Sequence, residues 1–334
     1  MNERGKRTMK AVQATAFGDP SVLTPVELPD PAPGPGQVTI DVSHATVGLI
    51  DVYLRQGLFK DRPGLARPPY VPGLEVAGTV RALGEGVDGL AVGEKVVAMA
   101  GDGTGGYASV FRSDHRRVVS TEGHALDPAL AAAAVPNAVM AHIALTRAIS
   151  LAEGERVLVH GALGAFAAAF PGIARQLGAA RIVGTVRAGR LAQAAATPLP
   201  YDEIVDSGDL AGALGDEKFD VVVDPVGGAL RTRSLDLLAP SGRLLLVGNA
   251  SGEWDHTLPS NALWYGNTVV AGFNAGGYVP AHPEAVPEAA RAALRAASAG
   301  LLTTPVEVLP LAEAARAHEK LESHATTGRL LLAP

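Results

Sequence analysis

Residues 157–167 read Val157-Leu158-Val159-His160-Gly161-Ala162-Leu163-Gly164-Ala165-Phe166-Ala167, and they carry the strongest structural signal of the chain. An apolar run leads into Gly161-x-x-Gly164-x-x-Ala167, and helix-compatible sequence follows. The glycines permit a tight turn whose backbone N–H groups can approach the pyrophosphate of a dinucleotide, and the helix start favours negative charge. We call residues 161–167 the glycine turn. They predict a coenzyme site built from Gly161, Leu163, Gly164, Ala165, Phe166 and Ala167.

A glycine pattern alone is weak evidence, and five further apolar runs strengthen it. With the first, the runs cover residues 156–161, 181–186, 203–206, 219–224, 243–248 and 268–273. Helix-compatible segments lie between most of them, which is the pattern of a doubly wound parallel sheet. We therefore expect a Rossmann-type α/β dinucleotide-binding domain over residues 128–302. Pro171-Gly172 should kink or shorten its first helix.

The rest of the chain has a different texture, rich in Gly and Pro with short apolar runs such as residues 38–42 and 95–99. Short strands between turn signals predict a mostly β domain over residues 1–127. Residues 303–334 return to this texture, with runs at 306–308 and 329–332 around a helix near 311–321. We expect this tail to rejoin the first domain.

Composition limits the function classes. The 334 residues are 47% hydrophobic and 19% charged with a net charge of −6, so we expect a folded protein with neither a nucleic-acid nor a membrane partner. The chain has no cysteine, which excludes disulfides, a thiolate nucleophile and cysteine-ligated metals. The polar N-terminus argues against a signal peptide, and the apolar stretch 126–149 is too interrupted for a membrane span. We expect a soluble, cytoplasmic protein.

The coenzyme is expected to be NADPH. The second strand ends in Arg187-Ala188-Gly189-Arg190, and no Asp or Glu occurs between Glu155 and Asp202 to bind a ribose 2′-hydroxyl. Arg187 and Arg190 are suited to a 2′-phosphate, with Arg187 the first choice. The alternative is a solvated basic helix start.

Further motifs support a family resemblance. Residues 72–80, with the sequence PGLEVAGTV, and 92–96 resemble the catalytic-domain core of medium-chain dehydrogenases/reductases. Residues 50–57, with the sequence IDVYLRQG, are similar to the substrate-cleft segment of the quinone oxidoreductase branch. The glycine turn, residues 224–228, 248–249, 272–273 and Thr327-Gly328-Arg329 match other family motifs in order. The resemblance implies a split, GroES-like, mostly β catalytic domain, an inserted coenzyme domain and a homodimer paired through the edge strand 268–273.

The resemblance also implies chemistry without zinc. Zinc-dependent members use a Cys and a His as ligands, whereas this chain has no cysteine and carries Leu74 where those members have the His before Glu75. Glu75 alone does not make a zinc site, which normally needs three protein ligands.

The family pattern places Asn249 and Phe273 near the nicotinamide, in a cleft between the domains. Gly227 would allow close backbone approach, and Arg329 would reach toward the coenzyme from the returning tail. For Phe273 the alternative is core packing, and for Asn249 it is a turn after a strand.

The main functional hypothesis is direct hydride transfer from NADPH to a quinone or an α,β-unsaturated carbonyl. Tyr53 is the candidate proton donor or carbonyl-orienting hydroxyl; a half-buried structural tyrosine, with water as the donor, is the alternative. Many family members have Asn at the position of Gly48 and an aromatic hydroxyl at that of Phe59, so fewer polar substrate contacts are expected here. Two other readings remain open: an enoyl reductase acting on an acyl thioester or natural-product intermediate, and an NADPH-binding sensor without turnover.

Two titratable residues are expected to be structural. His160 should be a buried strand-end histidine bonded to backbone, and Asp51 should order its local turn.

Overall fold

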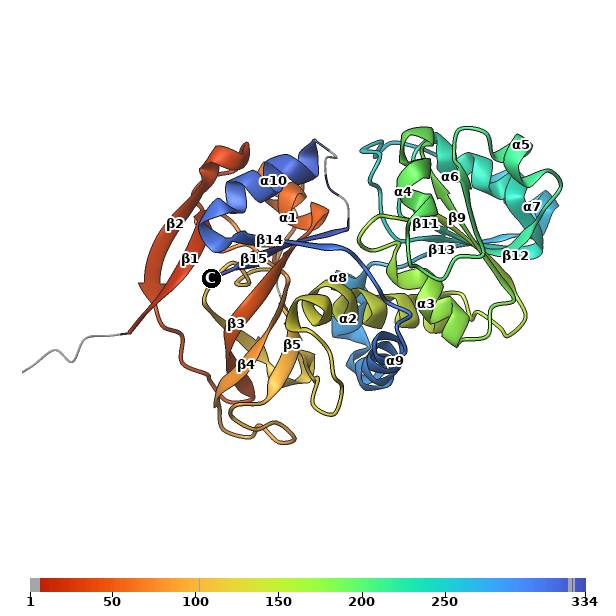
Figure 1. Ribbon diagram of the computed structural model, residues 1–334. Coiled ribbons are helices and arrows are strands. Elements are labelled where there is room, and N and C mark those ends of the chain that lie inside the picture. Colours follow the sequence, from red (N-terminus) through yellow and green to blue (C-terminus); the bar gives the residue numbers. More distant parts are fainter. Residues whose placement is uncertain (1–6, 102, 324–325, 327) are drawn as a thin grey trace, which may run out of the picture. The chain divides into compact units, whose positions relative to one another are not determined.

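The computed structural model describes residues 7–101, 103–323, 326 and 328–334 (Figure 1). Thr327 of the family motif and the six N-terminal residues lie outside this set. The chain forms two compact units, residues 1–136 with 305–334 and residues 137–304. The sequence places the boundaries at 127/128 and 302/303. The first difference arises because helix α2 (Pro128–Ile143) begins in the first unit and continues into the second.

The first unit is built mainly from strands. Within the described residues, seven strands form one sheet in the order β14-β15-β3-β4-β5-β7, with β6 pairing β3, and β1 and β2 form a separate hairpin (Figure 1). The strands are β1 (Thr8–Ala14), β2 (Leu23–Pro29), β3 (Gln37–Val47), β4 (Glu75–Leu83), β5 (Lys95–Met99), β6 (Val110–Asp114), β7 (Val118–Ser120), β14 (Val306–Pro310) and β15 (Arg329–Ala333). Pairing of β15 with β3 brings the returning tail into this sheet.

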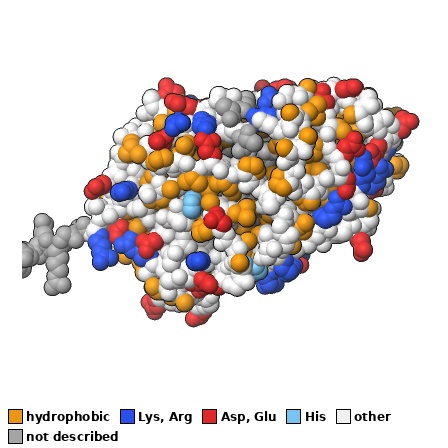
Figure 2. All heavy atoms as spheres, viewed as in Figure 1, with side chains coloured by type: hydrophobic (Ala, Val, Ile, Leu, Met, Phe, Trp, Pro, Cys, Tyr) orange, Lys and Arg blue, Asp and Glu red, His pale blue; other side chains and the backbone are white. Residues whose placement is uncertain are grey.

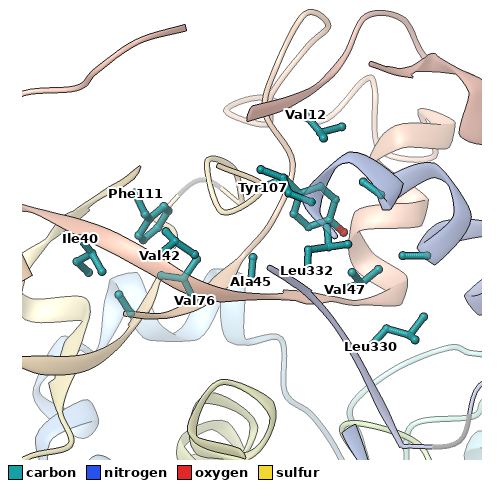
Figure 3. Packing of buried hydrophobic residues seen from close by; sticks show 14 of the residues in the cluster. Val12, Ile40, Val42, Ala45, Val47, Val76, Tyr107, Phe111, Leu330 and Leu332 are labelled. Atoms are coloured by element: carbon teal, nitrogen blue, oxygen red, sulfur yellow. The ribbon is translucent and has the colours of Figure 1, made fainter. Parts of the chain in front are cut away.

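Two helices, α1 (Leu49–Gln56) and α10 (Ala314–Glu322), accompany the first sheet (Figure 1). Buried apolar side chains of this unit form one cluster that includes Tyr107, Ile40, Val76 and Leu332 (Figure 3). Helix α1 begins at Gly48, whose N–H donates to the Asp51 carboxylate at 2.8 Å, and ends at Gly57 with φ +78°. These two ends fix the helix that carries Tyr53.

The second unit is a doubly wound sheet. Six parallel strands lie in the order β10-β9-β8-β11-β12-β13 within the described part of the chain. They are β8 (Arg156–His160), β9 (Arg181–Val186), β10 (Glu203–Asp206), β11 (Phe219–Asp224), β12 (Leu238–Leu246) and β13 (Val269–Gly272). This confirms the Rossmann-type prediction. β12 starts earlier than expected, with a register shift against β11 between Phe219 and Val221.

Helices connect these strands. They are α3 (Ala169–Gln176), α4 (Leu191–Ala195), α5 (Leu210–Leu214), α6 (Ala229–Arg233), α7 (Ser260–Gly266), α8 (Ala275–Ala281) and α9 (Val286–Ser298). α3 begins only at Ala169, so Pro171 occupies its first turn, where a backbone N–H has no intrahelical partner. The expected shortening of the first helix is confirmed.

One segment, Pro128–Ala148, is long and apolar enough by composition to cross a membrane. Of its most apolar window, 83% is buried within the protein, which is the behaviour of a core helix. On the face shown in Figure 2, acidic and basic side chains lie interspersed with apolar ones.

Candidate active site

The glycine turn leaves β8 as a tight, sheet-anchored loop. Gly161 has φ +62°, a conformation that favours glycine. The N–H of Gly164 donates back to the Gly161 carbonyl at 2.7 Å, and a Cβ at Gly164 would lie 3.0 Å from that oxygen. The N–H of Ala162 donates to the Thr185 carbonyl of β9 at 2.9 Å. The local geometry therefore favours glycine at both predicted positions, through the positive φ at Gly161 and the close carbonyl at Gly164.

Several N–H groups of this turn remain available. Within the described residues, those of Leu163, Ala165, Phe166 and Ala167 have no backbone or side-chain acceptor. Unpaired amides that follow a parallel strand at its carboxyl end form a binding site for a phosphate group. The residues present thus fit the pyrophosphate of a dinucleotide.

His160 is the last residue of β8, directly before this turn, and is fully buried. Its Nδ1 is 2.9 Å from the Thr185 hydroxyl and its Nε2 is 2.9 Å from the Ser234 hydroxyl. Burial lowers the pKa of His160 to about 4, so the ring is neutral at physiological pH. The structural role is as expected, but the partners are side-chain hydroxyls and not backbone groups.

The two arginines follow the carboxyl end of β9. Arg187 is exposed and makes no hydrogen bond or ion pair within the part of the chain that the structure describes. Arg190 donates from Nη1 to Gln193 Oε1 at 2.8 Å. Arg187 is therefore the guanidinium more readily committed to a ligand.

The loop after β11 is organised by a buried ion pair that the sequence did not reveal. The Asp224 carboxylate accepts the N–H groups of Val226 and Gly227, both at 2.8 Å, and the Arg231 Nε at 2.7 Å. Arg231 Nη2 also donates to the Gly248 carbonyl at 2.8 Å, which links the loops after β11 and β12. An acidic residue directly at a strand end was the available signal for this brace.

This brace brings two predicted residues together. Gly227 has φ +83°, and a Cβ there would lie 2.0 Å from Asn249 Oδ1. Asn249 Nδ2 is buried and has no partner among the described residues. Gly227 is thus a glycine because the Asn249 side chain occupies the space of a Cβ, and contact of either residue with the coenzyme stays a prediction.

Phe273 directly follows β13 and is 5% exposed. Its N–H donates to the Leu246 carbonyl at 2.9 Å, and its ring lies 5.4 Å from that of Tyr278. Packing thus accounts for its burial, while contact with a nicotinamide stays a prediction.

Tyr53 lies on α1 in the first unit and is half-buried. Its ring stands perpendicular to that of Phe59 with the centroids 6.4 Å apart, and the Arg62 guanidinium lies 4.9 Å from the Phe59 centroid. Burial raises the pKa of Tyr53, so its hydroxyl keeps its proton at neutral pH and remains a donor.

Asp51 orders the start of the same helix, as expected. It is 1% exposed and accepts the N–H groups of Gly48 at 2.8 Å and Gly73 at 3.2 Å. Burial raises the pKa of Asp51 to about 7.

Glu75 is committed to other groups of the first unit. Its Oε2 accepts from the Thr46 hydroxyl at 2.7 Å and forms an ion pair with Arg329. Arg329 retains an Nε without a partner within the described residues, so its role toward the coenzyme stays a prediction. The described residues contain no group of three His, Cys, Asp or Glu that could hold a metal.

The predicted residues fall into two sets. The glycine turn, Arg187, Gly227, Asn249 and Phe273 belong to the second unit, where the strands are parallel and their carboxyl ends share one edge of the sheet. Tyr53 and Arg329 belong to the first unit.

Two family models match the chain. Residues 34–124 match an alcohol dehydrogenase GroES-like domain, and residues 199–332 match a zinc-binding dehydrogenase domain. Quinone oxidoreductase 1 of Escherichia coli is 30% identical over 95% of this chain and 97% of its own length. A quinone oxidoreductase of Lama guanicoe is 32% identical over 73% of this chain and 74% of its own length. The crystal structure of an E. coli quinone oxidoreductase complexed with NADPH superimposes with a TM-score of 0.84 at 28% identity, covering 97% of this chain and all of that one.

Proposed function

Because the chain belongs to the quinone oxidoreductase branch of the medium-chain dehydrogenases/reductases, we propose that it is an NADPH-dependent reductase acting on a quinone or an α,β-unsaturated carbonyl. The observation that carries this proposal is the glycine turn at the carboxyl edge of a six-stranded parallel sheet, with four N–H groups that find no acceptor among the described residues. When bound, NADPH supplies the hydride.

The residues of the second unit bind and orient the coenzyme. The glycine turn holds the pyrophosphate, and Arg187, assisted by Arg190, holds the 2′-phosphate by charge-assisted hydrogen bonds. Asn249, whose Nδ2 has no partner among the described residues, and Gly227, which leaves room for the Asn249 side chain, are proposed to lie at the nicotinamide end. Phe273 completes this set, and Arg329 of the first unit is proposed as a further coenzyme-binding residue.

Tyr53 is the proton donor in this proposal. Since burial keeps its hydroxyl protonated, Tyr53 can donate a hydrogen bond to the substrate carbonyl and supply a proton when charge develops on that oxygen. Water is the alternative donor, and Tyr53→Phe separates the two by its effect on kcat.

A dedicated enoyl reductase is the second candidate, favoured by one observation. Phe59, which packs edge-on against Tyr53, and Gly48 present no side-chain hydrogen-bonding group where many relatives have one. Fewer polar contacts suit an acceptor whose affinity comes from a larger acyl portion. An NADPH-binding sensor is the third candidate, and absence of turnover would single it out.

We also propose that the protein works without zinc, as a cytoplasmic homodimer. The lack of cysteine and the commitment of Glu75 to Thr46 and Arg329 support zinc independence. β13 is an edge strand of its sheet, and Val269 in β13 and Trp264 and Tyr265 in α7 are 52%, 71% and 76% exposed. Exposed apolar residues beside an open strand edge support pairing with a second copy.

The test is NADPH oxidation by the purified protein, with and without EDTA, against small quinones, simple enones and an enoyl thioester. Turnover of quinones or enones that EDTA leaves unchanged supports the main proposal. Turnover of the thioester alone moves the assignment to an enoyl reductase. Binding without turnover of any acceptor contradicts the catalytic proposal.

A further inference from the structure

Two side chains outside the family motifs form hydrogen bonds with backbone carbonyls of the glycine turn. Tyr201, two residues before β10, donates from its hydroxyl to the Ala162 carbonyl at 3.2 Å and lies 3.5 Å from the Ala167 carbonyl. Asn137, on α2 and 7% exposed, donates from Nδ2 to the Ala165 carbonyl at 2.9 Å. All of these groups belong to the second unit.

These contacts determine where the N–H groups of the turn point. In a trans peptide the carbonyl and the N–H of one peptide plane point in opposite directions. Fixing the Ala162 carbonyl therefore directs the N–H of Leu163 away from Tyr201, and fixing the Ala165 carbonyl directs the N–H of Phe166 away from Asn137. Both N–H groups are among those without an acceptor in the described residues.

The two side chains supply bonds that the backbone around the turn does not. Among the described residues, the turn carbonyls of Gly161, Gly164, Phe166 and Ala167 accept backbone N–H groups, whereas those of Ala162 and Ala165 accept none. Amides bind an anion well only when they are held in place beforehand. Burial raises the pKa of Tyr201 well above its ordinary value, so its hydroxyl remains a donor at any physiological pH.

We propose that Tyr201 and Asn137 are positioning residues of the coenzyme site: they orient the pyrophosphate-binding amides without touching the coenzyme. The inference rests on the proposed function, since it takes NADPH as the ligand. It assigns a binding role to two residues that lie outside the glycine pattern and far from it in sequence.

The test compares the affinities of two ligands for Tyr201→Phe. The variant retains the ring, which packs beside Gly184 and Ala162, and removes only the hydroxyl. We expect the Kd of NADPH to rise about three- to tenfold, the effect of one net hydrogen bond. The Kd of 2′-phosphoadenosine, which lacks the pyrophosphate, should stay within about twofold of wild type, as should kcat at saturating NADPH, since the loss is in binding. Asn137→Ala should behave likewise.

Ser234→Ala is the matched control because it removes another buried hydroxyl of the second unit, one that bonds the Leu230 carbonyl and His160. It should lower the unfolding midpoint without changing the Kd of NADPH. Wild-type affinity for NADPH in both Tyr201→Phe and Asn137→Ala, or equal losses for both ligands, would overturn the inference and leave the proposed function intact. Wild-type protein that does not bind NADPH would overturn the proposed function, and this inference with it.

Discussion

Gly184, in β9, tests how closely the glycine turn is fitted to its sheet. Its φ lies outside the positive region, so the backbone accepts alanine there. An added Cβ would nevertheless lie 2.7 Å from the Cβ of Ala162 and 3.2 Å from side-chain atoms of Ile204 and Tyr201. Since nonbonded carbon atoms prefer a separation of about 3.5–4.0 Å, the glycine turn must move away from β9 by about 1 Å.

A displacement of this size should weaken coenzyme binding more than it weakens the fold. We expect Gly184→Ala to raise the Kd of NADPH by about 10- to 100-fold. The free energy of unfolding should fall by about 1–3 kcal/mol, the usual cost of overpacking. Isothermal titration calorimetry and urea unfolding measure the two effects.

A second-site change distinguishes contact from general damage. Ala162→Gly removes the methyl group that the new side chain meets, so the double variant should recover a large part of the affinity, measured against Ala162→Gly alone. Gly184→Ala with unchanged NADPH affinity, or a double variant with no recovery, would refute the reasoning.

Four further predictions address other parts of the molecule. Arg187→Ala should lower kcat/KM for NADPH by only about tenfold, because an exposed charge-assisted bond is partly screened. The kcat/KM for NADH should stay within about twofold of wild type, and an equal loss for both coenzymes would contradict the assignment. Burial lowers the pKa of His160 from 6.5 to about 4, so between these pH values the unfolded chain binds a proton that the folded protein does not. The free energy of unfolding should therefore fall by up to about 3 kcal/mol as the pH drops from 6.5 to 4. Urea unfolding of His160→Asn should show a correspondingly flatter pH dependence. The pKa of Asp51 is raised to about 7, so its contribution is present at low pH and is lost as the pH rises from about 4 through 7; Asp51→Asn should gain stability relative to wild type over that range, and a constant difference would contradict this. Val269→Lys places a charge on the open edge of β13 and should shift the mass measured by light scattering from dimer to monomer.

The sequence predicted the second unit well because its signals are local. Runs that are apolar on both faces, such as residues 219–224, correspond directly to buried parallel strands. The sequence predicts a later start for β12 because Pro240 and Gly242 break the apolar run, whereas in the structure Leu238 already pairs with Phe219 of β11 and regular pairing resumes at Arg243.

The candidate site was only partly predictable, for a different reason. The glycine turn can be predicted from residue type and spacing, but the side chains that bond to it cannot. Tyr201 and Asn137 are separated from their carbonyl partners by 39 and 28 residues and carry no motif. The Asp224–Arg231 brace likewise depends on two loops meeting, which composition and periodicity do not encode.

The exposed residues near the edge strand β13 also provide an intrinsic fluorescence signal for the proposed dimer contact. The chain has two tryptophans, and both belong to the second unit. Trp254 is 48% exposed and Trp264 is 71% exposed. Indole emission shifts to shorter wavelength when the ring leaves water. If two copies meet along β13 and α7, the emission maximum should move with protein concentration, without any label. A maximum that does not change on dilution through the dissociation range would place the contact elsewhere.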